Sequence, residues 1–112
     1  MNEIFRKTAL SFPGTEENAH FERRAFKITG RRIFATLQED QQSANIKLSL
    51  PDQATFSEYD KRAVFPLPNK WGLQGWTTFD LTMLTDEIVA EALYAAYIEM
   101  MGKKDISALV DI

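Results

Sequence analysis

The sequence of residues 25–37 is AFKITGRRIFATL, and this stretch decides the fold class. Residues 25–28 and 32–37 each place apolar side chains at every second position, which is typical of β-strands with one buried face. The turn between them contains Gly30, which tolerates the backbone angles of a tight turn. The stretch therefore predicts an antiparallel hairpin whose inward-facing side chains are Phe26, Ile28, Ile33, Ala35 and Leu37.

Further strands are predicted along the chain on both sides of a short helix. Residues 45–50 alternate apolar positions with Lys and Ser, and this is the clearest strand pattern in the sequence. Residues 76–81 predict another strand. Residues 64–65 predict a brief one, and Pro66 and Pro68 confine it to a sheet edge because proline cannot donate to a strand ladder.

The helices are predicted from caps and breakers. Residues 3–11 and 51–59 predict two of them, and a long helix begins after the capping residue Thr85 and ends near Gly102. The acidic segment after the first helix predicts a loop. The expected fold is α+β, with an antiparallel sheet flanked on one face by the N- and C-terminal helices.

Composition excludes several classes of site. The chain has 112 residues, which predicts a single domain over residues 1–112. It contains no cysteine, which excludes disulfides, thiolate metal sites, iron–sulfur clusters and cysteine nucleophiles. Because His20 is the one histidine, a site that needs two imidazoles is excluded as well. We therefore expect no cofactor and no metal site.

The sequence shows neither of two features that would direct the protein to a membrane or out of the cell. Residues 1–6 do not show the basic segment followed by an apolar run that marks a signal peptide. The sequence has no uninterrupted apolar run near the ~18 residues of a membrane span. A cytoplasmic protein without membrane contact is the expectation.

Positive charge is concentrated in one stretch. The chain carries a net charge of −3, yet residues 20–35 hold five basic side chains against the single acidic Glu22. Arg23 and Lys27 share strand parity opposite Phe26, so they are predicted to project from the outer sheet face. Arg31 and Arg32 follow at the turn, and Lys47 on the neighbouring strand can join the same face.

Such a row of cations is suited to phosphate groups of a nucleic acid. The alternative is a solvated strand face whose arginines pair with Glu22, Glu39 or Asp40 and keep the sheet soluble. The sequence leaves both interpretations open.

A second candidate site is the loop of residues 68–76, which reads PNKWGLQGW. Lys70 and Trp71 could contact or stack on a ligand, because an aromatic side chain next to a cation suits a nucleic acid. In the alternative interpretation, Trp76 covers the sheet edge and the two glycines serve only unusual backbone angles.

Catalytic and metal chemistry find little support in the residues. Glu16 and His20 are four positions apart, but a metal site needs a third ligand that the sequence does not indicate. His20 is expected in a loop or at a strand start, with one hydrogen bond. No serine lies in a nucleophile-elbow pattern, and no phosphate-binding glycine loop is present, so we expect no enzyme.

Three motifs resemble those of the MmcQ/YjbR-like family. Residues 12–17 (FPGTEE) resemble its P-G-x-x-E opening, residues 26–36 (FKITGRRIFAT) its F-x-V-x-G-K-x-F-A hairpin, and residues 71–78 (WGLQGWTT) its W-G-x-x-G-W/A-T segment. The resemblance implies a frataxin/CyaY-like fold and DNA binding through a double wing of hairpins. Where many members have lysine after the turn glycine, this chain has Arg31 and Arg32. The carboxylate ridge that iron binding would require on the first helix is absent, since that helix offers only Glu3.

These observations together predict a small non-enzymatic protein that binds DNA weakly and largely independently of base sequence. The alternative is a protein-interaction module that uses the acidic surface of the last helix or the apolar tail of residues 106–112. The residues expected to contact DNA are Arg23, Lys27, Arg31, Arg32, Lys47, Lys70 and Trp71.

Overall fold

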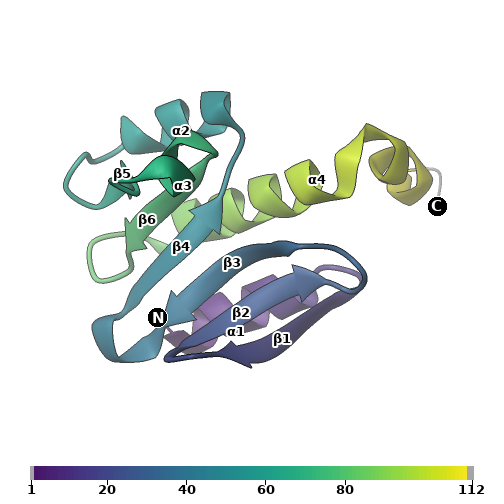
Figure 1. Ribbon diagram of the computed structural model, residues 1–112, viewed down its shortest axis with the longest axis horizontal. Coiled ribbons are helices and arrows are strands. Elements are labelled where there is room, and N and C mark those ends of the chain that lie inside the picture. The colour runs from purple at the N-terminus through teal and green to yellow at the C-terminus, as the bar shows by residue number, and fades with distance from the viewer. Residues whose placement is uncertain (1, 111–112) are drawn as a thin grey trace.

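An antiparallel sheet is the centre of the fold in the computed structural model (Figure 1), which describes the backbone of residues 2–110 and the side chains of residues 2–102. Within that part of the chain, the sheet has six strands in the order β1-β2-β3-β4-β6-β5. The strands are β1 (Thr15–His20), β2 (Arg23–Ile28), β3 (Ile33–Gln38), β4 (Ser43–Lys47), β5 (Val64–Pro66) and β6 (Trp76–Asp80).

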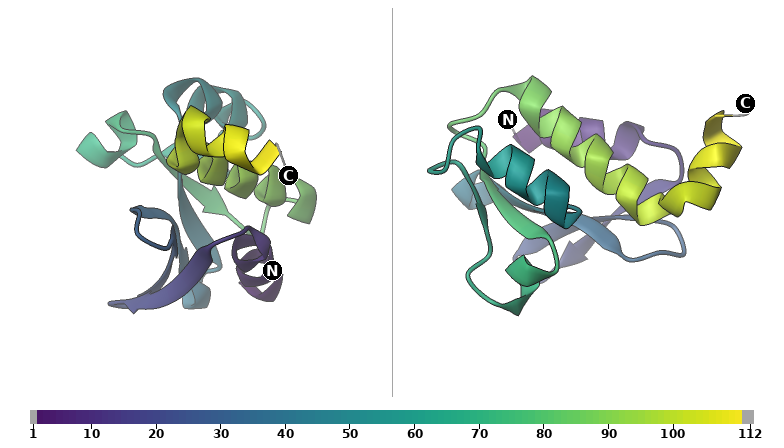
Figure 2. Two further views of the ribbon diagram at one scale, coloured as in Figure 1. Left: turned by 90° about the vertical axis from the view of Figure 1, so that its right-hand side faces the viewer. Right: turned by 90° about the horizontal axis from the view of Figure 1, so that it is seen from above.

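The helices leave one face of the sheet open. The terminal helices α1 (Asn2–Ser11) and α4 (Asp86–Val110) lie on the same side of the sheet, as Figures 1 and 2 show. Two shorter helices, α2 (Leu50–Ser57) and α3 (Lys70–Leu73), connect the strands at the β5–β6 end, and the single turn η1 (Glu39–Gln41) joins β3 to β4. We call the side under α1 and α4 the covered face and the other side the open face. The α+β class and the placement of the terminal helices are confirmed.

Aromatic side chains form much of the core on the covered face. Tyr97 of α4 is 2% exposed, and its ring lies 5.0 Å from that of Phe12 and 6.3 Å from that of Phe34. The Tyr97 hydroxyl donates a hydrogen bond of 2.8 Å to the carbonyl of Pro13, so the buried polar atom has a partner. On α1, Phe5 meets Phe26 of β2 edge-on at 5.6 Å. These contacts hold both terminal helices on the hairpin.

The ends of the helices follow the predicted caps in part. The Ser49 hydroxyl accepts the backbone N–H of Asp52 and begins α2, and Thr85 accepts that of Ile88 as predicted. Gly102, with φ of 81°, interrupts α4 where an end was predicted, but helical backbone resumes to Val110. The tail side chains of residues 106–112, considered above as a docking segment, lie outside the described residues.

The acidic segment after α1 forms a strand, so the predicted loop is wrong. β1 reads TEENAH and pairs with β2 alone, from Thr15 opposite Ile28 to His20 opposite Arg23. An edge strand needs no continuous apolar face, and polar side chains protect it from pairing with other chains. Its hydrophobic pattern is therefore too weak to predict it.

A bulge changes which side chains of the hairpin face inward. Phe26 pairs with Ala35, whereas Lys27 pairs with Ile33, so Phe34 is an extra residue in β3. Phe34 and Ala35 are both fully buried, while Ile33 is only half-buried and lies on the open face. The prediction that Ile33 faces inward is therefore wrong. Leu50, also predicted in a strand, instead begins α2 and is 56% exposed.

Charged side chains connect α1 to the first strands. The carboxylate of Glu17 on β1 lies 3.0 Å from Arg6 Nε and 2.9 Å from Arg24 Nη1. Arg24 Nε also lies 2.7 Å from Glu39 Oε1. The Glu17 side chain is only 12% exposed, and its removal would leave Arg6 and Arg24 without their shared partner.

We expect Glu17→Ala to lower the free energy of unfolding by about 2 kcal/mol, because hydrogen bonds to charged groups are lost. Urea unfolding measures the change. Glu58→Ala is the matched control, since Glu58 is exposed and an exposed substitution changes stability by no more than about 0.5 kcal/mol. Equal effects of the two substitutions would contradict the role of Glu17.

The Arg24 guanidinium sets the protonation of its second partner. Its hydrogen bond, and then its charge, hold the pKa of Glu39 below the usual range, although burial opposes this shift. The pair therefore contributes stability that is complete above the unfolded-state pKa of about 4.3 and is lost as the pH falls through the folded pKa.

In Arg24→Gln we expect the pKa of Glu39 to rise toward its ordinary value, measured by carboxyl-carbon NMR titration. Arg62→Gln is the control, because Arg62 pairs with Asp60 instead. An unchanged pKa of Glu39 in Arg24→Gln would show that a group other than Arg24 lowers it.

Candidate functional site

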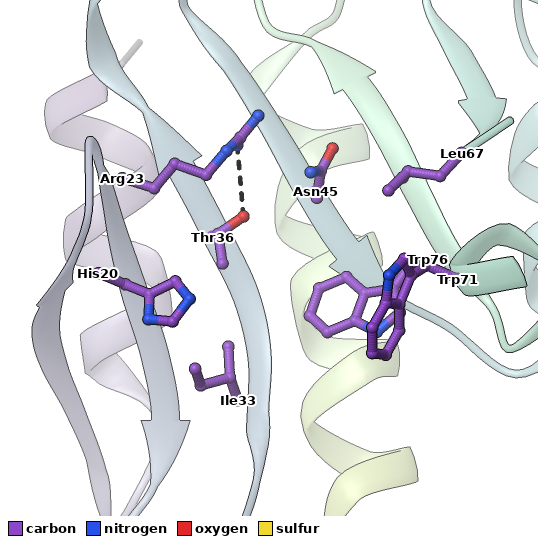
Figure 3. A pocket seen from close by; sticks show the side chains of 8 residues that line it. All are labelled: His20, Arg23, Ile33, Thr36, Asn45, Leu67, Trp71 and Trp76. Carbon is purple, nitrogen blue, oxygen red and sulfur yellow. Dashed lines mark hydrogen bonds between the residues drawn. The ribbon is translucent and has the colours of Figure 1, made fainter. Parts of the chain in front are cut away.

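The open face carries a hollow of about 270 Å³, shown in Figure 3, which we call the Trp hollow. Its volume is below that of a typical drug-sized pocket, so it suits one planar ring rather than a whole large ligand. Side chains from β1 to β4, from the residue after β5, from α3 and from the start of β6 contribute to it. The lining residues are His20, Arg23, Ile33, Thr36, Asn45, Leu67, Trp71 and Trp76.

Arg23 supplies a half-buried cation to this hollow. Its guanidinium donates to Gln38 Oε1 at 2.9 Å and to Thr36 Oγ1 at 3.4 Å, which are both neutral. Burial lowers the pKa of Arg23, partly opposed by the charge of Asp40, yet a guanidinium stays protonated at neutral pH. Among residues 2–102, no carboxylate forms an ion pair with Arg23. A partly desolvated cation whose hydrogen-bond partners are neutral attracts an anion, and Asp40 is the nearby negative charge that acts on Arg23.

Trp71 and Trp76 lie together at the other end of the Trp hollow (Figure 3). Trp71 is 48% exposed, while Trp76 is half-buried at the start of β6. Lys70 lies beside Trp71, with Nζ 5.6 Å from the centre of the indole ring. Of the two positions predicted as a second contact, Trp71 thus lines the same hollow as Arg23, and Lys70 contacts the Trp71 ring.

A hydrogen-bonded segment holds Trp71 in place. The side chain of Asn69 accepts the Trp71 backbone N–H at 2.9 Å and begins α3, a helix that the sequence did not predict. Buried Gln53 of α2 donates to the carbonyl of Gly72 at 2.9 Å and to Thr77 Oγ1 at 3.1 Å. A polar side chain in this apolar position stabilises the structure only while it keeps its partners, so the segment has little freedom.

Four of the predicted cations surround the β2–β3 turn and the adjacent end of β4. Lys27, Arg31 and Arg32 line one depression of the open face, next to the Trp hollow. Arg32 and Lys47 line a separate depression together with Ala96, Glu99 and Met100 of α4, so it lies against that helix and not on the open face. Lys47 Nζ donates to the carbonyl of Gln74, so it also reaches the segment that carries Trp71.

Two of these cations also have structural partners. Lys27 Nζ lies 3.7 Å from Glu16 Oε1, and a hydrogen bond from Thr29, followed by one from Asn18, holds the pKa of Glu16 below its usual range. Arg31 Nη1 donates to the carbonyl of Met100 at 3.4 Å, near the break in α4. Carbonyl groups at the end of a helix carry partial negative charge, so this contact favours Arg31. The alternative interpretation, in which the arginines form ion pairs with acidic neighbours, holds for Arg24, which pairs with Glu39. Arg24 is not one of the residues predicted to contact DNA.

The hollow contains residues that the sequence did not single out. Asn45 of β4 accepts the Thr78 hydroxyl at 2.9 Å, and its amide nitrogen lies on the side of the hollow (Figure 3). Asn45 stands opposite Thr36 in the register of β3 and β4. Strand parity, together with the pairing of β3 and β4, would have identified this pair from the sequence. Leu67 lies outside the strands and helices, so no periodic pattern predicts its position.

His20 lies at the rim of the hollow and not in a metal-binding cluster. Its ring meets that of Phe21 edge-on at 4.9 Å. Within the described residues, no three histidine, aspartate or glutamate side chains are grouped closely enough to hold a metal ion. Over the same part of the chain, no helix combines the length and apolar character that crossing a membrane requires.

Comparisons with known proteins agree with the family expected from the motifs. A family model described as YjbR matches residues 10–99, so the chain belongs to the YjbR family. The search of curated proteins returned no match. Among solved structures, the crystal structure of protein DR2400 of Deinococcus radiodurans, with the domain DUF419, is similar with a TM-score of 0.75 and 18% sequence identity. The match covers 98% of this chain and 88% of that one, and at this identity it shows the fold alone.

The position of Trp71 depends on a close approach at Gly75. Gly75 has φ of +106°, and a Cβ there would lie 1.9 Å from the carbonyl oxygen of Leu48. Gly30 has φ of +82° but open space around it. We expect Gly75→Ala to cost about 3 kcal/mol, from strain and overlap, and Gly30→Ala about 1 kcal/mol, from strain alone.

Urea unfolding gives both free energies, and near-ultraviolet circular dichroism follows the tryptophans. Gly75→Ala should change the tryptophan bands, and Gly30→Ala should leave them unchanged. Equal costs for the two substitutions would mean that the segment around Gly75 moves away from Leu48 without a further loss of stability.

Proposed function

We propose that this member of the YjbR family is a non-enzymatic DNA-binding protein whose open face holds the phosphate backbone, largely independently of base sequence. One observation carries the proposal: Lys27, Arg31 and Arg32 line a depression of the open face that shares His20 and Ile33 with the Trp hollow. Arg23 and Trp71 line that hollow, and Lys70 lies beside Trp71. Phosphate contacts position a protein on DNA without reading its bases.

The distribution of charge supports an anionic partner. In this group of cations, Lys27 forms an ion pair with Glu16. Among the described residues, Arg23, Arg32, Lys47 and Lys70 have no such partner. The net charge of −3 therefore hides a local excess of cations, although Glu99 lines the depression of Arg32 and Lys47, and Glu22 lies in a depression with Arg23.

The proposal includes no catalytic step. Proton transfer or nucleophilic attack would need a side chain coupled to a base or an acid. Arg23 is a permanent cation, so it does not act as a base. The contact of His20 is with the ring of Phe21, which is neither an acid nor a base. The open face is thus proposed as a binding surface and the protein as free of cofactors.

A protein-interaction module is the second candidate, and the exposed side of α4 is the observation that favours it. Tyr94 is 55% exposed beside exposed Glu91. A photo-cross-linking residue at position 94, compared with one at exposed position 58, would yield an adduct of one defined mass only at position 94. No adduct, or the same adducts at both positions, would exclude a partner at this surface.

DNA binding is tested by fluorescence anisotropy of labelled duplex and single-stranded DNA across a salt series. If four or five phosphates are contacted, the logarithm of the duplex affinity should fall against the logarithm of salt concentration with a slope of roughly −4. Lys27→Gln/Arg32→Gln should reduce the magnitude of that slope by about 2. This double variant leaves Arg31 and its contact with α4 intact.

The matched control is Lys7→Gln/Lys61→Gln, which has the same net charge but changes exposed lysines on α1 and in the loop before β5. Its slope should equal that of the unchanged protein. Absence of binding at low salt would refute the proposal. Equal slopes for the two double variants would refute the assignment to the open face.

A further inference from the structure

We infer that the Trp hollow binds one unpaired nucleobase, with an adjacent phosphate on Arg23, so that the protein prefers single-stranded DNA to duplex. The inference rests on the proposed function and adds to it the state of the DNA and the place where a base is held. It combines three features of the hollow: an accessible indole, a half-buried cation and polar groups on its floor.

The first feature is the accessible aromatic surface. Trp71 is 48% exposed although it borders a hollow, and its backbone is fixed by the Asn69 cap and by the Gln53 hydrogen bonds to the same segment. A ring held in this way loses little conformational freedom when a ligand stacks on it. Every base has a π-face, so stacking binds bases without selecting among them.

The second feature is the cation at the opposite end. Arg23 is half-buried, hydrogen-bonded to Gln38 and Thr36, and free of carboxylate partners within residues 2–102. The hydrogen bonds to Thr36 and Gln38 leave further guanidinium N–H groups for an anion, because the group has five. A phosphate next to the stacked base would satisfy this charge.

The third feature is the polar floor between the two ends. Asn45 uses its amide oxygen to accept the Thr78 hydroxyl, so it can offer the hollow only N–H donors. Donors alone can meet the ring nitrogen or carbonyl acceptors that all bases possess. The floor therefore favours a base over an apolar ring without specifying which base, in agreement with binding that is largely independent of sequence.

The shape of the ligand follows from these features. In a duplex, the faces of the bases are covered by their neighbours in the stack, so Trp71 could reach only the backbone. A single strand can turn one base into the hollow while its next phosphates meet the cations on either side. Lys27 and Arg32 lie toward the β2–β3 turn, and Lys70 lies beside Trp71.

The experiment compares three probes at one low salt concentration: oligothymidylate of about ten nucleotides, a duplex of the same length, and thymidine monophosphate. Anisotropy gives the affinity for the two DNA forms, and quenching of tryptophan fluorescence gives the affinity for all three. The variants are Trp71→Ala, the conservative Trp71→Phe, and Leu73→Ala. Leu73 is the control because it lies on α3, is 79% exposed and does not line the hollow.

We expect oligothymidylate to bind at least about 10-fold more tightly than the duplex, with tryptophan quenching. Trp71→Ala should lose about 10-fold in affinity for oligothymidylate and leave duplex affinity unchanged. Trp71→Phe should keep most of the affinity, and Leu73→Ala all of it. Retained folding of each variant is checked by its urea midpoint.

Three results would overturn the inference: equal or tighter binding of duplex, an unchanged affinity of Trp71→Ala for oligothymidylate, or equally tight binding of thymidine monophosphate. If duplex and single strand bind equally and both depend on Lys27 and Arg32, the proposed function stands without this inference. If neither form binds at low salt, both fail.

Discussion

The packing of α4 across one face of the sheet is the interaction on which the rest of the structure depends. Tyr97 connects that helix to Phe12 and the Pro13 carbonyl, which follow α1, and to Phe34 of the hairpin, so three segments meet at one side chain. Burial of these rings supplies much of the apolar area that the domain removes from water. Because both terminal helices are used on this face, the other face stays open to solvent.

The open face acquires its character from the strands that the covered face requires. Alternation puts Arg23, Lys27 and Lys47 opposite the buried positions, and the bulge at Phe34 moves Ile33 to the same side. The result is a surface in which cations lie near half-buried Ile33 and the polar side chains of Thr36 and Asn45. Trp71 completes it from a helix of four residues that the buried amide of Gln53 holds against the sheet. The proposed binding surface and the core that stabilises the fold therefore lie on opposite faces of one sheet.

The hairpin of residues 25–37, the clear strand before α2 and the capped final helix could be predicted because each has a local cause. Period-two alternation, a glycine turn and a threonine cap act within a few residues. β1 could not be predicted, since its stability comes from the ladder with β2 and from Glu17 contacts with Arg6 and Arg24. The inward position assigned to Ile33 failed for a similar reason: a bulge is a property of two paired strands.

By itself, the sequence determined the α+β class, the family motifs, the concentration of cations in residues 20–35 and the side of the hairpin on which Arg23 and Lys27 lie. These follow from composition and from the period of a strand. Only the tertiary structure decided that Arg24 is used in ion pairs, that Arg31 contacts α4, and that Arg23, Asn45 and Trp71 share one hollow. The strand order β3-β4-β6 brings these distant segments side by side, and such non-local pairing leaves no periodic signal in any one segment.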